Sequence, residues 1–129
     1  MLKLLIADDV AASRELIGTV LDGIGFEILE AADGQEALRI ARAEKPSVII
    51  LDIQMPLMDG YEVLKEIRRD HEMAATPVIA LTASAMQGER ERALNAGFTA
   101  YVTKPISIAA LRAEVKRLAG GPAQRAVGE

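Results

Sequence analysis

Short apolar runs alternate with longer amphipathic stretches along the chain. The apolar runs are strand-length and cover residues 2–7, 26–31, 47–51, 77–81 and 99–102. Several of these runs are continuously hydrophobic, as expected for strands that are covered on both faces of a parallel sheet. The pattern therefore predicts five buried strands.

The stretches between these runs have the periodicity and the end signals of helices. The first carries an apolar stripe that ends at Gly23 and Gly25, and the last carries one that ends at Gly120-Gly121-Pro122. Asp33 and Asp59 are each followed, three residues later, by a glutamate, which is a capping-box pattern. The stripe residues are Leu16, Ile17, Val20, Leu21 and Ile24 in the first helix, and Ile108, Leu111, Val115 and Leu118 in the last.

The alternation of strands and helices predicts one domain over residues 1–119. With short loops, a (βα)5 order gives a doubly wound α/β fold with right-handed crossovers. Residues 120–129 lack a pattern and are expected to form a flexible C-terminal tail. In such folds the functional groups lie outside the carboxyl ends of the strands, near the point where the strand order reverses. The residues that directly follow each apolar run are therefore the candidates for a site.

The composition excludes several kinds of protein. The chain has 129 residues, with 15 Lys and Arg against 19 Asp and Glu, and its net charge of −4 has the wrong sign for a protein that grips nucleic acid through phosphates. The absence of cysteine excludes disulfides, zinc–thiolate sites and cysteine nucleophiles. A single histidine, His71, excludes a histidine-rich metal site.

No segment predicts a membrane protein. The longest apolar runs are far shorter than the roughly 18 residues that span a bilayer. Two aspartates end the first run, and a signal peptide would not carry them there. A cytoplasmic location is therefore expected.

Polar side chains follow four of the predicted strands. Asp8 and Asp9 follow the first strand, Asp52 the third, Thr82 the fourth and Lys104 the fifth. Since these strand ends meet at one edge of the sheet, three carboxylates, a hydroxyl and an ammonium should converge there. Carboxylates this close repel one another, and one would hold a proton unless a cation intervenes. Mg²⁺ suits the site, because it prefers hard oxygen ligands and takes few protein carboxylates.

A site of this composition can receive a phosphoryl group. A carboxylate can act as the nucleophile and form an aspartyl phosphate. Mg²⁺, the Lys104 ammonium and the Thr82 hydroxyl would position and neutralise the phosphoryl oxygens. Asp52 is the best candidate for the nucleophile, because it ends the central strand alone, whereas the adjacent Asp8 and Asp9 suit metal binding. Taken without the other residues, Asp8 and Asp9 would more simply cap the following helix.

These residues resemble the signature of response-regulator receiver domains of two-component signalling. The matching segments are Asp8-Asp9, residues 52–60 (Asp-Ile-Gln-Met-Pro-Leu-Met-Asp-Gly), residues 80–83 (Ala-Leu-Thr-Ala) and Lys104-Pro105. Each segment alone is a weak signal, but all four at the family's spacing form a strong one. The resemblance covers residues 1–119, with every element in order.

The resemblance implies a flavodoxin-like fold with a five-stranded parallel sheet in the order 2-1-3-4-5. It implies phosphotransfer to Asp52 from a histidine kinase or a histidine phosphotransfer protein. It also implies that Mg²⁺ is held by Asp9, Asp52 and the backbone carbonyl of Gln54, with Asp8 acting through water. The downstream partner would be a protein target, with no direct contact to nucleic acid or membrane.

Other positions take their roles from the same resemblance. Tyr101 matches the aromatic switch residue, which moves inward when Thr82 shifts toward the phosphate. The Lys104–Pro105 bond is cis in this family, in line with the rule that cis bonds occur at proline. Independently of the resemblance, Asp59 is expected to cap a helix and Gly60 to be a backbone requirement, and neither to be a ligand. Gln54 and Ser84 occupy positions that influence the rate of dephosphorylation in the family.

The weakest predicted helix covers residues 84–96. It contains Gly88, few large apolar residues and a run of charges at 89–92. An ordinary solvated helix with charge pairs explains this pattern, and a marginally stable element that shifts on phosphorylation is the functional alternative. With Tyr101, it would then form a protein-binding face together with the small residues of the last helix, Ala109, Ala110 and Ala113.

Finer features favour a single-domain response regulator. Residues 82–86 and 104–107 are similar to receivers of hybrid kinases and of stand-alone cell-cycle regulators of the DivK type. Met1 directly before the first strand and the short tail favour the stand-alone form. A receiver module cut from a hybrid kinase or a DNA-binding response regulator is the alternative. Family members often dimerise through the fourth and fifth helices, which leaves a homodimer open.

Two other functions fit the residues less well. A Mg²⁺-dependent aspartyl-phosphate phosphatase usually has a second acid two residues after the nucleophile, where this chain has Gln54. A flavin carrier would need a hydroxyl- and glycine-rich phosphate loop where Asp8-Asp9-Val10 instead repels phosphate. The sequence therefore predicts a phosphorylation-controlled interaction protein that catalyses only its own phosphorylation and dephosphorylation.

Overall fold

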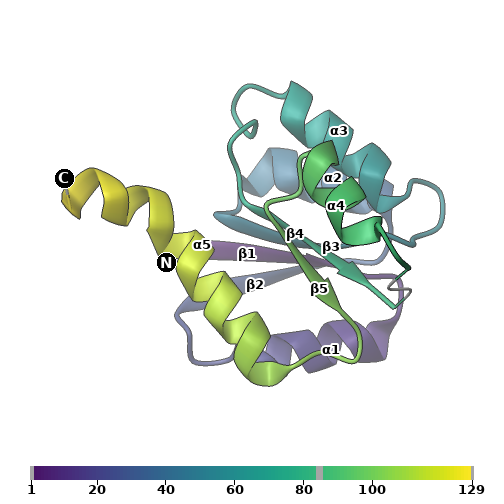
Figure 1. Ribbon diagram of the computed structural model, residues 1–129, viewed down its shortest axis with the longest axis horizontal. Coiled ribbons are helices and arrows are strands. Elements are labelled where there is room, and N and C mark those ends of the chain that lie inside the picture. Colours follow the sequence, from purple (N-terminus) through teal and green to yellow (C-terminus); the bar gives the residue numbers. More distant parts are fainter. Residues whose placement is uncertain (1, 84–85, 129) are drawn as a thin grey trace.

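A parallel sheet with strand order β2-β1-β3-β4-β5 forms the centre of the computed structural model (Figure 1). The structure describes residues 2–83 and 86–128, with the backbone alone beyond residue 119. The five strands are β1 (Leu2–Ala7), β2 (Phe26–Ala31), β3 (Val48–Asp52), β4 (Val78–Thr82) and β5 (Ala100–Thr103). The α/β fold class and the strand order expected from the sequence are confirmed.

Helices cover both faces of the sheet (Figure 1). α1 (Ala11–Val20) and α5 (Ile108–Gly128) lie on one face, and α2 (Gly34–Glu44), α3 (Gly60–Arg69) and α4 (Glu89–Ala96) lie on the other. Each face has its own apolar cluster, one that includes Ile17 and Leu111 and another that includes Leu38 and Leu64. Because both faces are covered, every residue of β3 and β4 is buried, which explains their continuous hydrophobic runs.

Three strands continue one residue beyond the predicted apolar run. β3 includes Asp52, β4 includes Thr82 and β5 includes Thr103. The hydrophobic pattern stops before these residues, but their backbone still pairs with the neighbouring strand, as Thr82 does opposite Thr103. The functional side chains of β3 and β4 therefore belong to the rigid sheet itself and not to a loop.

The two predicted capping boxes differ in outcome. At α3, Asp59 accepts a hydrogen bond from the Glu62 amide, and the Glu62 side chain accepts one from the Asp59 amide. At α2, Asp33 accepts from the Glu36 amide, but the Glu36 carboxylate accepts from the Ala32 amide, 2.7 Å away. The second box is therefore only half formed, because Glu36 binds the residue before the cap.

The first and last helices, α1 and α5, differ in part from what the sequence predicts. The helical backbone of α5 continues to Gly128, so the predicted stop at Gly120-Gly121-Pro122 is wrong. The residues that follow Pro122 include good helix formers, and the last turns project away from the sheet (Figure 1). Leu16 and Ile108, which were expected in the core, are 51% and 59% exposed because each lies at the edge of its stripe.

Among the described residues, no helix is long and apolar enough to cross a membrane.

Candidate functional site

Three carboxylates lie together at the carboxyl end of the sheet. Asp8 and Asp9 directly follow β1, and Asp52 ends the adjacent strand β3. One carboxylate oxygen from each residue lies within 4.8 Å of the others. Asp8 is fully buried, Asp52 is 5% exposed, and Asp9 is exposed to solvent. The acidic pocket that the sequence predicts is therefore present, and Asp9 is its most accessible member.

Asp8 is held by the backbone around it. Its amide donates to the Ala31 carbonyl at 3.1 Å, and its Oδ1 accepts from the Val10 amide at 2.9 Å. Val10 is the N-cap of α1 and makes no side-chain capping bond. The interpretation of Asp8 and Asp9 as caps of this helix is therefore wrong, since the Asp8 carboxylate turns back onto its own loop.

Lys104 places its ammonium between the two buried carboxylates. Its Nζ lies 3.0 Å from Asp8 Oδ2 and 3.2 Å from Asp52 Oδ2. The Lys104 amide donates to the Thr82 carbonyl at 2.7 Å, which ties this residue to the end of β4. The Lys104–Pro105 peptide bond is cis, as the family resemblance implies. The side chain remains 22% exposed, so the ammonium forms one wall of an accessible site.

The charges in this site alter the proton affinities of all three groups. Burial raises the pKa of Asp52 above its usual 3.8, and the nearby Asp8 charge adds to this, against the opposing effects of Lys104 and the Gln54 amide. Burial also opposes ionisation of Asp8, but hydrogen bonds from Ser13, Val10 and Lys104 outweigh it and lower its pKa. For Lys104, burial is outweighed by the two carboxylates, and its pKa is raised. Lys104 therefore stays protonated at neutral pH.

The other predicted residues surround this centre. The Thr82 side chain is fully buried at the end of β4, next to β3. The backbone amide of Gln54 donates to Asp52 Oδ1 at 2.9 Å. The role of the Gln54 carbonyl as a metal ligand stays a prediction. Tyr101 is half-buried, and its hydroxyl donates to Glu89 Oε1 at 2.9 Å. Ser84 lies outside the described residues.

Gly60 supports the strand end that carries Asp52. Its amide donates to the Ile53 carbonyl at 2.8 Å. A Cβ atom at this position would lie 2.7 Å from both the Asp52 carbonyl oxygen and the Ile53 Cα, which are backbone atoms that cannot move aside. The site geometry therefore requires a residue without a side chain at position 60.

The donor set fits a small divalent cation. Asp8 Oδ2 is buried and, among the described residues, makes the ion pair with Lys104 but no hydrogen bond of good geometry. Lone pairs on a buried carboxylate are costly to leave unused, and a cation or its water would use them. Three carboxylates and one ammonium leave a formal charge of −2, which a single Mg²⁺ would neutralise.

Two contacts near the site were not predicted from the sequence. Arg14 donates from Nη1 to the Asp8 carbonyl at 2.7 Å, and Glu89 accepts from Tyr101. The contact of Glu89 could not be recognised, because this residue belongs to a run of charges that is typical of any solvated helix. For Arg14 the sequence did offer a signal, namely a cation near the N-terminus of a predicted helix. A cation there is unfavourable unless another group compensates for it.

Known proteins match nearly the whole chain. The family model of the response regulator receiver domain matches residues 4–116. A probable transcriptional regulator, ycf27 of Cyanophora paradoxa, is 40% identical over 116 residues, which are 90% of this chain and 47% of that protein. The polar-differentiation response regulator DivK of Brucella anthropi is 39% identical over 106 residues, which are 82% of this chain and 86% of that protein. The chain thus spans about half the length of one kind of relative and most of the length of another.

Solved structures agree with these relatives. The receiver domain of the sensor histidine kinase PA1611 from Pseudomonas aeruginosa, solved with a magnesium ion coordinated in its active site cleft, superposes with a TM-score of 0.85. It is 34% identical and covers 93% of this chain and 98% of its own. With the acidic pocket at the ends of β1 and β3 and a family match from residue 4 to residue 116, this chain belongs to the response-regulator receiver domains of two-component signalling.

Proposed function

We propose that this receiver domain takes a phosphoryl group onto Asp52 in a Mg²⁺-dependent reaction and thereby switches its binding to another protein. The observation that carries the proposal is the convergence of three carboxylates with the Lys104 ammonium at one edge of the sheet. Such a site can hold a divalent cation and neutralise a phosphoryl group during transfer. The exposed Asp9 makes the pocket accessible from solvent.

Asp52 is the best nucleophile of the three acids. Asp8 is fully buried, which keeps its carboxylate out of reach of a phosphodonor. Asp9 is exposed to solvent, and the two ion pairs of Lys104 go to Asp8 and Asp52 instead. Asp52 pairs with Lys104 at 3.2 Å and lies beside the strand that ends in Thr82, so it is near both groups that would bind phosphoryl oxygens.

The transfer consists of one bond formed and one broken. An oxygen of ionised Asp52 attacks phosphorus as the P–N bond to a donor histidine breaks, and the imidazole leaves with the bonding electron pair. The phosphoryl oxygens are received by the Lys104 ammonium and the Thr82 hydroxyl. Asp9, Asp52 and the Gln54 carbonyl would hold Mg²⁺, with Asp8 acting through water, and the ion would neutralise charge on the same oxygens. The domain would catalyse only this step and the later hydrolysis of its own acyl phosphate.

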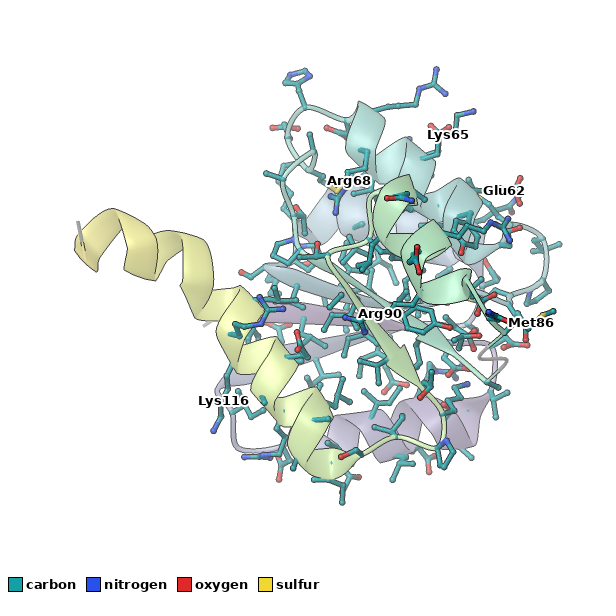
Figure 2. The ribbon with its side chains drawn as sticks, viewed as in Figure 1. Glu62, Lys65, Arg68, Met86, Arg90 and Lys116 are labelled. Atoms are coloured by element: carbon teal, nitrogen blue, oxygen red, sulfur yellow. The ribbon has the colours of Figure 1, made fainter. Side chains whose placement is uncertain are left out.

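An apolar groove beside the site suits the phosphodonor. Its volume is about 360 Å³, it adjoins Lys104, and its lining includes Val10 and Leu16, each 51% exposed. Met86, 70% exposed, lies at the same end of the sheet (Figure 2). Apolar side chains around an acidic centre favour a protein donor, namely a histidine kinase or a histidine phosphotransfer protein, since a small molecule needs no such surface.

The proposed output face lies on α4, β5 and α5. α4 has only eight residues, and only Ala93 among them is buried. The Tyr101–Glu89 hydrogen bond joins β5 to the first turn of this weakly packed helix. Inward movement of Tyr101 after a shift of Thr82 would break that bond and change the face, which includes the exposed Ala109. A downstream protein or a second copy of the domain would bind there.

A stand-alone regulator and a module of a longer protein remain alternatives. The DivK-like relative, most of whose length is matched, favours the first, and the ycf27 relatives, matched over about half their length, favour the second. A Mg²⁺-dependent phosphatase is disfavoured, because Gln54 stands where such enzymes have their second acid. Cytoplasmic location stays a prediction that cell fractionation checks.

The proposal is tested by phosphorylation with acetyl phosphate. The wild-type chain should gain one phosphoryl group, detected by intact mass, only when Mg²⁺ is present. Asp52→Asn should gain none, whereas Asp59→Asn, which alters an exposed helix cap, should be labelled like the wild type. Undiminished labelling of Asp52→Asn would refute the assignment of the acceptor.

A further inference from the structure

Arg14 binds the loop that carries the acidic pair without lying in the site. It lies in the second turn of α1, with its side chain 17% exposed. Nη1 donates to the backbone carbonyl of Asp8 at 2.7 Å, and Nε lies 3.0 Å from Oε1 of Glu30. These two bonds fix the guanidinium beside the loop that follows β1.

We propose that Arg14 is a positioning residue that orients the Asp9 carboxylate for divalent-cation binding. This inference rests on the proposed function, because it assumes that the three carboxylates hold a metal ion. Arg14 acts through the peptide bond between Asp8 and Asp9. Since a peptide unit is planar, fixing the Asp8 carbonyl also fixes the direction in which the chain enters Asp9.

Asp9 needs this support more than the other two acids do. Asp8 is fixed by the Val10 amide and Lys104, and Asp52 by the Gln54 amide and Lys104. Within residues 2–83 and 86–128, the Asp9 side chain has neither a hydrogen bond nor an ion pair. Its place in the site is therefore set by its backbone alone, and Arg14 holds that backbone.

Glu30 completes the arrangement from the neighbouring strand. It belongs to β2, and its carboxylate accepts a hydrogen bond from Arg14 Nε, whereas Nη1 donates to the Asp8 carbonyl. Glu30 directly precedes Ala31 in β2, and the Ala31 carbonyl accepts a hydrogen bond from the Asp8 amide. The peptide before Asp8 is thus bonded to β2 through the Asp8 amide, and the peptide after Asp8 is bonded to Arg14 through the Asp8 carbonyl. Glu30 joins Arg14 to the same strand, β2.

The test is calorimetric titration of MgCl₂ into the unphosphorylated protein. Arg14→Ala should weaken Mg²⁺ binding on the order of 10-fold, the usual effect of losing a group that orients a metal ligand. Arg14→Lys, which can still donate to the Asp8 carbonyl, should recover part of the loss. Glu30→Gln should weaken binding less than Arg14→Ala, because the Asp8 bond remains.

Arg112 provides a matched control. Its guanidinium also donates to backbone carbonyls, those of Val20 at 2.6 Å and of Asp22 at 3.3 Å. These carbonyls lie at the C-terminal end of α1, away from the acidic pair. Arg112→Ala should lower thermal stability and leave the Mg²⁺ affinity within twofold of the wild type. An equal loss of affinity in Arg14→Ala and Arg112→Ala would show a purely structural effect and overturn the inference.

The outcomes separate this inference from the proposed function. If the wild type takes up no Mg²⁺, the metal site fails. If the wild type binds Mg²⁺ and Arg14→Ala binds it equally well, only the role of Arg14 fails. If Arg14→Ala does not fold, Arg14→Lys and Glu30→Gln decide the question, since wild-type affinity in both would contradict the inference.

Discussion

Leu57 has a backbone conformation that non-glycine residues seldom adopt. Its φ is 70°, in the left-handed region, and its side chain is 75% exposed in the loop between Asp52 and α3. The left-handed conformation costs a leucine about 1–2 kcal/mol. The exposed side chain provides little packing in return, so the loop stores strain next to the phosphorylation site proposed here.

Replacing Leu57 with glycine should therefore stabilise the domain. The relief of strain exceeds the extra freedom that glycine gives the unfolded chain, for a net gain of roughly 0.5–1 kcal/mol in the free energy of unfolding. Urea denaturation measures it. Gly97→Ala is the mirror control, since its φ of 117° favours glycine and the substitution should destabilise the domain. A loss of stability in Leu57→Gly would contradict the assigned conformation.

Tyr101 gives a spectroscopic readout of the proposed switch. Burial and the hydrogen bond to Glu89 raise its pKa to about 12, and burial also raises the pKa of Tyr61 above its usual 10. The folded state then holds the phenolic proton more tightly than the unfolded state does. The resulting stabilisation is present below pH 10 and is lost as pH rises from 10 toward 12.

An alkaline absorbance titration checks this assignment. The chain has two tyrosines and no tryptophan, so tyrosinate formation is measured without interference. Both phenols should ionise above pH 10 in the folded protein, with Tyr101 last, near pH 12. Glu89→Gln should bring the last step to lower pH, because it removes the carboxylate charge that opposes ionisation. Ionisation of both tyrosines at the ordinary value would contradict the Tyr101–Glu89 bond.

At the scale of elements, Arg68 fixes one end of α4. Its guanidinium donates to the Gly97 carbonyl from Nε at 3.1 Å and from Nη2 at 2.8 Å, and to the Thr76 carbonyl from Nη1 at 2.8 Å. It lies between α3 and α4, whereas Lys65 of the same helix points outward (Figure 2). The C-terminal end of α4 is thus anchored, while its first turn is joined to β5 by Glu89.

Arg68→Ala should destabilise the domain by about 1–3 kcal/mol, because hydrogen bonds from a charged group to part-buried carbonyls are lost. Arg69→Ala is the matched control, since Arg69 is next in sequence, 67% exposed and, within the described part of the chain, ion-paired with Glu66 alone, at 3.5 Å. Its loss should cost less than about 0.5 kcal/mol. Urea denaturation of both variants compares them, and equal effects would mean that Arg68 is no anchor.

For the whole molecule, the sequence predicted the strands and the acidic site, because these depend on hydrophobic runs and on the residues at their ends, whereas the sheet order came from the family resemblance. It did not predict contacts between distant side chains, such as Arg14 with Glu30 or Arg68 with Gly97. Charged residues at such positions look like solvated surface until the fold brings their partners close. The helical end of α5 was missed because local breakers predicted a stop.

Bound Mg²⁺ should stabilise the folded state of the whole domain. At about ten times its dissociation constant, free Mg²⁺ adds about 1.4 kcal/mol to the free energy of unfolding if only the folded state binds it. Thermal melting with MgCl₂, against NaCl at equal ionic strength, measures the effect. Asp9→Asn should remove most of it. Equal melting temperatures in the two salts would contradict a metal site at the three carboxylates.

The most direct test of the account locates the phosphoryl group on the chain. After reaction with acetyl phosphate and Mg²⁺, borohydride converts an aspartyl phosphate to homoserine, which peptide mass spectrometry places at a single residue. The account predicts homoserine at position 52 and at neither Asp8 nor Asp9. Homoserine at either of those positions, or a chain that stays unmodified, would contradict it.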